Sequence, residues 1–172
     1  MRELCDSLAA GILKICEANN TKIACAESLT GGLLADAFVR IPGASNVLLG
    51  SAVTYDINAK ASILHVDKAL LDREGAVHPE VARQMAIGTA RLYSQPEYGD
   101  RITGVAGPGP DGDKPAGLVY VGLRIPASLT PDHAEVLKAV ELHLDGMREE
   151  IRRLTVFHVL QNLSLFTASF KE

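Results

Sequence analysis

Apolar residues recur at helical spacing at the start of the chain. Leu4, Leu8, Ile12 and Ile15 lie three or four residues apart, which predicts an amphipathic helix through about Glu17. Further helices are expected at about residues 31–40, 57–63, 67–73 and 79–93, and a last helix opens at Met147, Ile151 and Leu154.

Short runs of aliphatic and β-branched residues between these helices predict strands. They cover about residues 22–26, 47–55, 101–105, 118–124 and 134–144. Neither a linker nor an internal repeat interrupts the chain, and 172 residues are typical of one compact domain. The order of the elements favours a single α/β domain over residues 1–172, built around a mixed sheet.

The charge balance narrows the range of partners. The net charge is −4 and the pI about 5.7, so we expect no broad basic face and no nucleic-acid partner. No segment reaches the roughly 18 apolar residues that span a bilayer, and the N-terminal segment carries acids, unlike a secretory signal. We therefore expect a cytoplasmic protein without a membrane partner. Cys5, Cys16 and Cys25 form no CxxC pair and are expected to be buried, reduced thiols.

The stretch AESLTGG, residues 26–32, joins a predicted strand to a predicted helix. Its two glycines let the backbone approach a ligand closely, and free amides at a helix start attract anions. Ser28, just before those amides, could attack a carbonyl group while the amides hold the oxyanion. The alternative is that Ser28 merely caps the helix and the glycines pack against the sheet, and the local pattern by itself favours this.

The stretch TYDINAK, residues 54–60, places Tyr55 at a strand end and Lys60 in the first turns of the next helix. The helix dipole repels a cation near a helix N-terminus, and desolvation disfavours the ammonium form, so Lys60 could act as a base. The alternative is a solvated surface lysine beside a half-buried tyrosine.

The segment from Gly104 to Gly112 is too rich in glycine and proline to be anything but a loop. It contains neither the GxxxxGK[ST] of a Walker loop nor the GxGxxG of a dinucleotide fingerprint, so the signal for phosphate binding is weak. The five histidines show no HxxxH or HExxH spacing, and no metal site is expected. No histidine is placed as the partner of a serine, so Lys60 is the better candidate for the base of a serine nucleophile.

Taken together, these segments are similar to the CinA C-terminal domain family. The similarity lies in AESLTGG, IPGASNVLLGSAVTYDINAK, REGAVHPEVARQMAIGTARL, TGVAGPGPDGDKPAGLVYVGL and GMREEIR, in the family's order and spacing over about residues 4–163. The resemblance implies a three-layer α/β/α domain in a stand-alone form. It also implies hydrolysis of a carboxamide: nicotinamide mononucleotide and water give nicotinate mononucleotide and ammonia, without a metal or a cofactor.

The resemblance assigns roles to individual residues. It implies Ser28 as the nucleophile and Lys60 as its general base, with Tyr55 and Ser45 orienting the pair or relaying protons. The substrate-binding residues it implies are Thr30, Gly31 and Gly32 around the oxyanion, and Thr103, Gly104, Gly107, Lys114 and Arg148 around the phosphoribosyl group.

Ser45 is the residue of this set whose expected position is hardest to reconcile with the others. If residues 47–55 form one straight strand, Ser45 lies about 30 Å from its far end. Its participation would need a bend near Gly50, a reversed strand or a neighbouring subunit. An exchange of roles between Ser28 and Ser45 stays open.

The sequence departs from the family pattern in three places. Leu29 replaces the usual cysteine of AESCTGG, residues 56–58 alter the turn before Lys60, and GMRE at 146–149 lacks the acid of the usual GDRE. Two rival functions therefore stay open: a catalytically silent nucleotide-binding or competence- and damage-related interaction module, and hydrolysis of a different amide. The family also favours a homodimer or higher homo-oligomer that binds a small nucleotide.

Overall fold

The computed structural model describes residues 1–97, 101–106 and 114–168, and its elements follow the predicted order. The helices are α1 Arg2–Ala18, α2 Leu33–Val39, α3 Ile57–Leu64, α4 Lys68–Glu74, α5 Pro79–Leu92 and α6 Arg148–Ala168, with short 3-10 turns at Ala44–Asn46 and Ala127–Leu129. The strands are β1 Lys22–Glu27, β2 Leu48–Val53, β3 Arg101–Ala106, β4 Leu118–Ile125 and β5 Val136–His143. The predicted helices and strands are confirmed to within a few residues, whereas the two 3-10 turns were not predicted.

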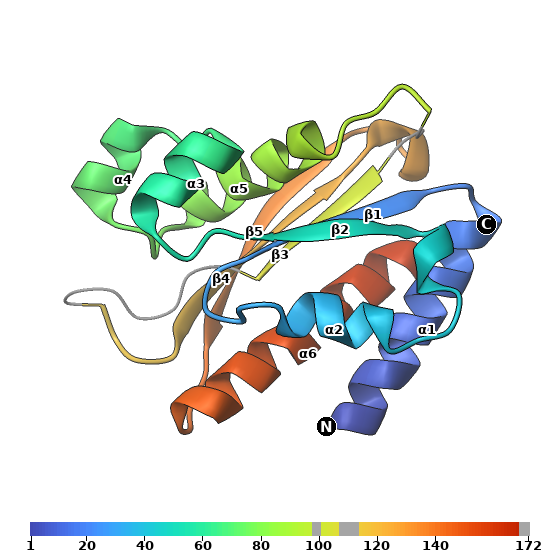
Figure 1. Ribbon diagram of the computed structural model, residues 1–172, viewed down its shortest axis with the longest axis horizontal. Coiled ribbons are helices and arrows are strands. Elements are labelled where there is room, and N and C mark those ends of the chain that lie inside the picture. The colour runs from blue at the N-terminus through green and yellow to red at the C-terminus, as the bar shows by residue number, and fades with distance from the viewer. Residues whose placement is uncertain (98–100, 107–113, 169–172) are drawn as a thin grey trace.

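One five-stranded sheet forms the middle layer, in the order β2-β1-β3-β4-β5. Strands β2, β1 and β3 run parallel, while β4 and β5 are antiparallel to their neighbours. Figure 1 shows α3, α4 and α5 on one face of this sheet and α1, α2 and α6 on the other. The predicted α/β fold with three layers and a mixed sheet is confirmed.

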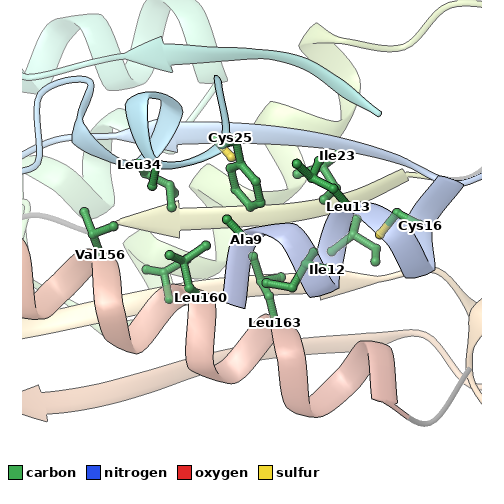
Figure 2. Packing of buried hydrophobic residues seen from close by; sticks show 14 of the residues in the cluster. Ala9, Ile12, Leu13, Cys16, Ile23, Cys25, Leu34, Val156, Leu160 and Leu163 are labelled. Atoms are coloured by element: carbon green, nitrogen blue, oxygen red, sulfur yellow. The ribbon is translucent and has the colours of Figure 1, made fainter. Parts of the chain in front are cut away.

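The larger apolar core lies between the sheet and the layer of α1, α2 and α6. Figure 2 shows Leu13 and Cys16 of α1, Ile23 and Cys25 of β1, and Leu163 of α6 within this core, and all five are at most 5% exposed. Cys5 is buried too, and all three cysteines are free thiols, as predicted. Burial raises the pKa of the Cys16 thiol to about 12. The amphipathic pattern of α1 is thus explained by packing against the sheet and α6.

The parallel strands bring the candidate chemistry to one end of the sheet. Glu27 at the end of β1 pairs with Val53 at the end of β2, and the amide of Thr54 donates to the carbonyl oxygen of Glu27 at 2.9 Å. The crossover from β1 to β2 lies on one face and that from β2 to β3 on the other, so β1 and β3 flank a topological switch point. Ligands of open α/β sheets bind at the carboxyl ends of strands beside such a point.

In the described part of the chain, none of the helices has the length and apolar character needed to span a bilayer.

Candidate active site

The amine of Lys60 reaches the hydroxyl of Ser28 at the carboxyl ends of β1 and β2. Lys60 Nζ lies 3.1 Å from Ser28 Oγ, 2.6 Å from the carbonyl oxygen of Thr54 and 3.0 Å from that of Tyr55. Lys60 is fully buried and Ser28 is 4% exposed. Two protonation states fit these contacts. An ammonium donates to all three oxygens, whereas a neutral amine donates to the two carbonyls and accepts from the serine hydroxyl.

Helix α3 holds Lys60 in this place. The carboxylate of Asp56 caps the helix by accepting from the amides of Asn58 and Ala59, at 2.8 and 3.3 Å. At the other end of α3, the carbonyl of Leu64 packs directly on Gly88 of α5, where a Cβ atom would lie 1.9 Å from the Leu64 oxygen. Only glycine permits this approach, and it fixes the helix against its neighbour.

A buried carboxylate, which the sequence analysis did not single out, binds the start of α2. Glu27 is fully buried, and its Oε2 accepts from the amides of Gly32 and Leu34, each at 2.9 Å. Its Oε1 accepts from the amide of Ala35 at 3.0 Å and from the hydroxyl of Ser51 at 2.7 Å. An acid at the end of an otherwise apolar strand, just before a helix, was the available signal. The helix N-terminus that was expected to attract a ligand anion is occupied by an anion of the chain itself.

The free amides of this corner are therefore not those expected. The amide of Gly32 donates to Glu27, and that of Gly31 to the carbonyl of Ser28 at 3.1 Å, so both glycine amides have acceptors within the chain. The φ angles of Gly31 and Gly32 are both positive, at +54° and +104°, so α2 begins only at Leu33. The amides of Leu29 and Thr30 instead have no acceptor among the described residues. The buried hydroxyl of Thr30 likewise has no hydrogen-bond partner among the described residues.

Arg152, a second residue that the sequence analysis missed, binds the same loop from α6. Its Nε donates to the carbonyl of Leu29 at 2.9 Å and its Nη2 to that of Thr30 at 3.0 Å. Its Nη1 donates to Glu149 at 2.7 Å. The available signal was its place in GMREEIR, one helical turn after Arg148 and on the same side of the helix.

Ser28 opens onto a pocket of about 340 Å³ that is also lined by two of the arginines of α6, Arg148 and Arg152. The lining residues are Ser28, Leu29, Gly31, Tyr55, Arg148, Glu149 and Arg152. The Tyr55 side chain is 63% exposed, and its hydroxyl accepts from Arg148 Nη2 at 2.9 Å. The structure thus brings Ser28, Lys60, Tyr55, Gly31 and Arg148 together.

Ser45 lies at the other end of the sheet. It is exposed, in the 3-10 turn before β2, and β1 and β2 pair in parallel from Ile23 and Leu48 onward. The register shift beside Gly50 does not reverse the strand. Within one chain, Ser45 therefore does not meet the Ser28–Lys60 pair, and a role across subunits stays a prediction.

The expected phosphate-binding residues around β3 are used elsewhere. The Thr103 hydroxyl donates to the carbonyl of Ala86 in α5 at 3.0 Å, and a Cβ atom on Gly104 would lie 3.2 Å from Leu163 of α6. These neighbours hold helices to opposite faces of the sheet. Lys114 Nζ donates to the carbonyls of Glu74 and Val77, and Gly107 lies outside the described residues. Across the described ranges, no three His, Cys, Asp or Glu side chains gather as a metal site would require.

The chain is similar to proteins whose names refer to competence and damage. One relative, from Caldanaerobacter subterraneus subsp. tengcongensis, is named as a competence-damage inducible protein and is 41% identical to this chain over 148 residues. The matched region covers 86% of this chain and 34% of the relative. It is 41% identical over 156 residues to a CinA-like protein from Frankia casuarinae, with 90% and 34% covered. The chain thus spans about a third of the length of these relatives.

Solved structures have the same fold. A CinA superfamily protein from Klebsiella pneumoniae superposes with a TM-score of 0.81 at 22% identity, over 95% of this chain and 98% of that one. A competence/damage inducible protein from Agrobacterium tumefaciens gives a TM-score of 0.78 at 30% identity, with 95% of both chains covered. A sequence model of the CinA C-terminal domain matches residues 5–166, and the chain therefore belongs to the CinA C-terminal domain family.

Proposed function

We propose that this chain hydrolyses the carboxamide of nicotinamide mononucleotide, with Ser28 as the nucleophile and Lys60 as the general base. The observation that carries this proposal is the 3.1 Å contact between Lys60 Nζ and Ser28 Oγ beside an open pocket. Burial disfavours the ammonium form of a lysine, and a neutral amine in this position can accept the serine proton.

The reaction then runs in two halves. Ser28 Oγ attacks the carboxamide carbon and its proton passes to Lys60 Nζ. Lys60 returns that proton to the amide nitrogen, the C–N bond breaks, and ammonia leaves an ester on Ser28. Water attacks the ester and gives a proton to Lys60, which passes it to Ser28 Oγ as the carboxylic acid departs.

The amides of Leu29 and Thr30 are the proposed donors to the oxyanion. They have no acceptor in the described part of the chain, and they directly follow the nucleophile. The N–H of the residue after a nucleophile is a common oxyanion donor. The Gly31 and Gly32 amides do not share this role, because their bonds shape the loop instead.

Arg148 is the proposed partner of the phosphate group. Its guanidinium lies at the pocket and contacts the Tyr55 hydroxyl, and guanidinium groups bind phosphate through paired hydrogen bonds. Tyr55 would then orient Arg148, whereas the resemblance implied that it orients the Ser28–Lys60 pair or relays protons. Arg152 adds positive charge at the same pocket.

The direct test is release of ammonia from nicotinamide mononucleotide by the purified protein. We expect turnover by the wild type, insensitive to a chelator, and none by Ser28→Ala or Lys60→Met when both variants keep the wild-type circular dichroism spectrum. A panel of other nucleotide carboxamides tests the substrate. Full turnover in both variants would contradict the Ser28–Lys60 pair.

A second candidate is a nucleotide-binding module without catalysis. The three oxygens around Lys60 Nζ favour it, because an ammonium satisfies all three and cannot accept a proton. In that case nicotinamide mononucleotide raises the melting temperature, yet no ammonia appears during long incubation.

A further inference from the structure

We infer that Arg152 is a positioning residue that sets the direction of one oxyanion donor, the N–H of Thr30. This inference rests on the proposed function, since it names the side chain that preorganises the Ser28 loop for the reaction. Arg152 acts through the backbone of the loop and does not touch the reacting atoms.

The geometry follows from the planarity of the peptide bond. The carbonyl of Leu29 and the N–H of Thr30 belong to one peptide plane and point in opposite directions. Arg152 Nε holds that carbonyl at 2.9 Å, so the guanidinium fixes where the Thr30 N–H points. A hydrogen bond from a cation to the carbonyl also polarises the peptide group and strengthens its N–H as a donor.

The peptide plane of the other proposed donor, the N–H of Leu29, is held by a hydrogen bond within the loop itself. The carbonyl of Ser28 and the N–H of Leu29 share the preceding peptide plane, and that carbonyl accepts from the amide of Gly31 at 3.1 Å. Of the two proposed donors, only that of Thr30 therefore depends on a side chain from α6. At the far end of the loop, Glu27 binds the Gly32 amide at 2.9 Å. The loop is thus held between a buried carboxylate and a guanidinium.

The contacts of Arg152 distinguish it from a substrate-binding arginine. Each of its three nitrogens donates to an acceptor of the chain, namely Leu29, Thr30 and Glu149, and its side chain is 28% exposed. Arg148, one turn earlier, is exposed at the start of α6 and reaches only the Tyr55 hydroxyl among the described residues. Two arginines on one side of a helix therefore have different tasks: Arg148 faces the ligand and Arg152 faces the loop.

The test separates kcat from KM in Arg152→Ala and Arg152→Lys. Loss of one oxyanion donor lowers kcat by about 10²–10³-fold, and we expect Arg152→Ala to approach the lower end of this range, with KM changed less than about 3-fold. Arg152→Lys keeps the positive charge but lacks the planar guanidinium that binds the Leu29 and Thr30 carbonyls through separate nitrogens, so its kcat should fall between those of the wild type and Arg152→Ala. The matched control is Arg153→Ala, which removes an equal charge and a 2.9 Å contact to the same Glu149, and should leave both constants unchanged.

A second measurement does not depend on the amide substrate. A fluorophosphonate phosphonylates a reactive serine, and its phosphoryl oxygen takes the place of the oxyanion, so the labelling rate of Ser28 reports the donors directly. We expect this rate to fall in Arg152→Ala, and added guanidinium ion to restore part of it. Should Arg152→Ala not fold, Arg152→Lys carries the comparison.

The outcomes separate the two proposals. If the wild type is labelled and turns over, but Arg152→Ala matches it or only raises KM, the inference about Arg152 is wrong while the proposed function stands. If wild-type Ser28 is neither labelled nor active, the proposed function fails and the inference fails with it. If Ser28 is labelled without turnover and Arg152→Ala slows labelling, the positioning role holds and only the substrate assignment fails.

Discussion

Ser28 and Ser45 are serines in glycine-containing loops beside the same pair of strands, yet their surroundings differ completely. Ser28 follows β1, is 4% exposed and meets a buried lysine, while its loop is bound by Glu27 and Arg152. Ser45 precedes β2, is exposed and lies in a 3-10 turn. The difference arises because parallel strands place all their carboxyl ends at one edge, where the following helices converge.

The comparison shows what makes a serine a candidate for catalysis. Flanking glycines occur at both positions, so the local pattern does not separate them. What separates them is a base and fixed backbone groups, which come from segments 32 and more than 120 residues away in the sequence. Three predictions test this contrast.

The largest effect is expected when each of the two serines is replaced by alanine separately and the two variants are compared. Ser28→Ala should lower kcat for amide hydrolysis by at least about 10⁴-fold, because both halves of the reaction use its oxygen. Ser45→Ala should retain activity within about two-fold, measured by ammonia release under saturating substrate. The two variants should have equal melting temperatures to within a few degrees.

The opposite result for Ser45 would break the contrast. If Ser45→Ala lost activity and light scattering showed a dimer or larger assembly, Ser45 would act across a subunit contact, as the sequence left open. We propose that the protein is a homo-oligomer, and the same scattering measurement tests this.

A smaller effect is expected from the carboxylate that holds the Ser28 loop. Glu27→Gln places an amide NH₂ among backbone N–H donors and removes a charged acceptor, so we expect a loss of about 3 kcal/mol in the free energy of unfolding. Ser51→Ala, which removes only the 2.7 Å hydroxyl bond to Glu27, should cost about 1 kcal/mol. Urea unfolding with unchanged m-values measures both. Equal costs would show that the Gly32, Leu34 and Ala35 amides do not depend on the charge.

The smallest effect concerns the cap of the helix that carries Lys60. Hydrogen bonds from backbone amides, chiefly that of Asn58, hold the pKa of Asp56 below its ordinary value of 3.8. A depressed folded-state pKa stabilises the protein above the unfolded-state value, and this contribution is lost as the pH falls through the folded-state pKa. Asp56→Asn should therefore melt slightly below the wild type at neutral pH, and the gap should narrow as the pH falls below 3.8 and through the lower folded-state pKa. A gap that widened in acid would contradict this sign.

Much of the fold could be predicted from the sequence because its signals are local. The spacing of Leu4, Leu8, Ile12 and Ile15 indicates α1, and the runs at β1 and β4 are short and apolar, as buried strands are. Helix α2 was expected to begin at Gly31 or Gly32, but the positive φ angles of both glycines move its start to Leu33. A backbone conformation of this kind is not visible in hydrophobic periodicity.

The site was only partly predictable. Ser28 and Lys60 could be proposed as partners from the family resemblance and from the absence of a histidine partner. Thr103, Gly104 and Lys114 were expected around a phosphate group. In the structure, Thr103 and Gly104 contact helices on the two faces of the sheet, and Lys114 binds backbone carbonyls of the chain. Glu27 and Arg152 were missed because most of their hydrogen-bond partners are backbone groups, which every residue carries and no motif displays.

The sequence by itself determined the alternation of elements and the chemistry available, since periodicity and side-chain identity are properties of the chain. Only the tertiary structure decided which of these groups meet. The parallel pairing of β1 with β2 brings Lys60 to Ser28 and leaves Ser45 at the opposite end. The packing of α6 brings Arg152 to the carbonyls of Leu29 and Thr30. Contacts between distant segments follow from burial shared by the whole fold, so no stretch of sequence specifies them alone.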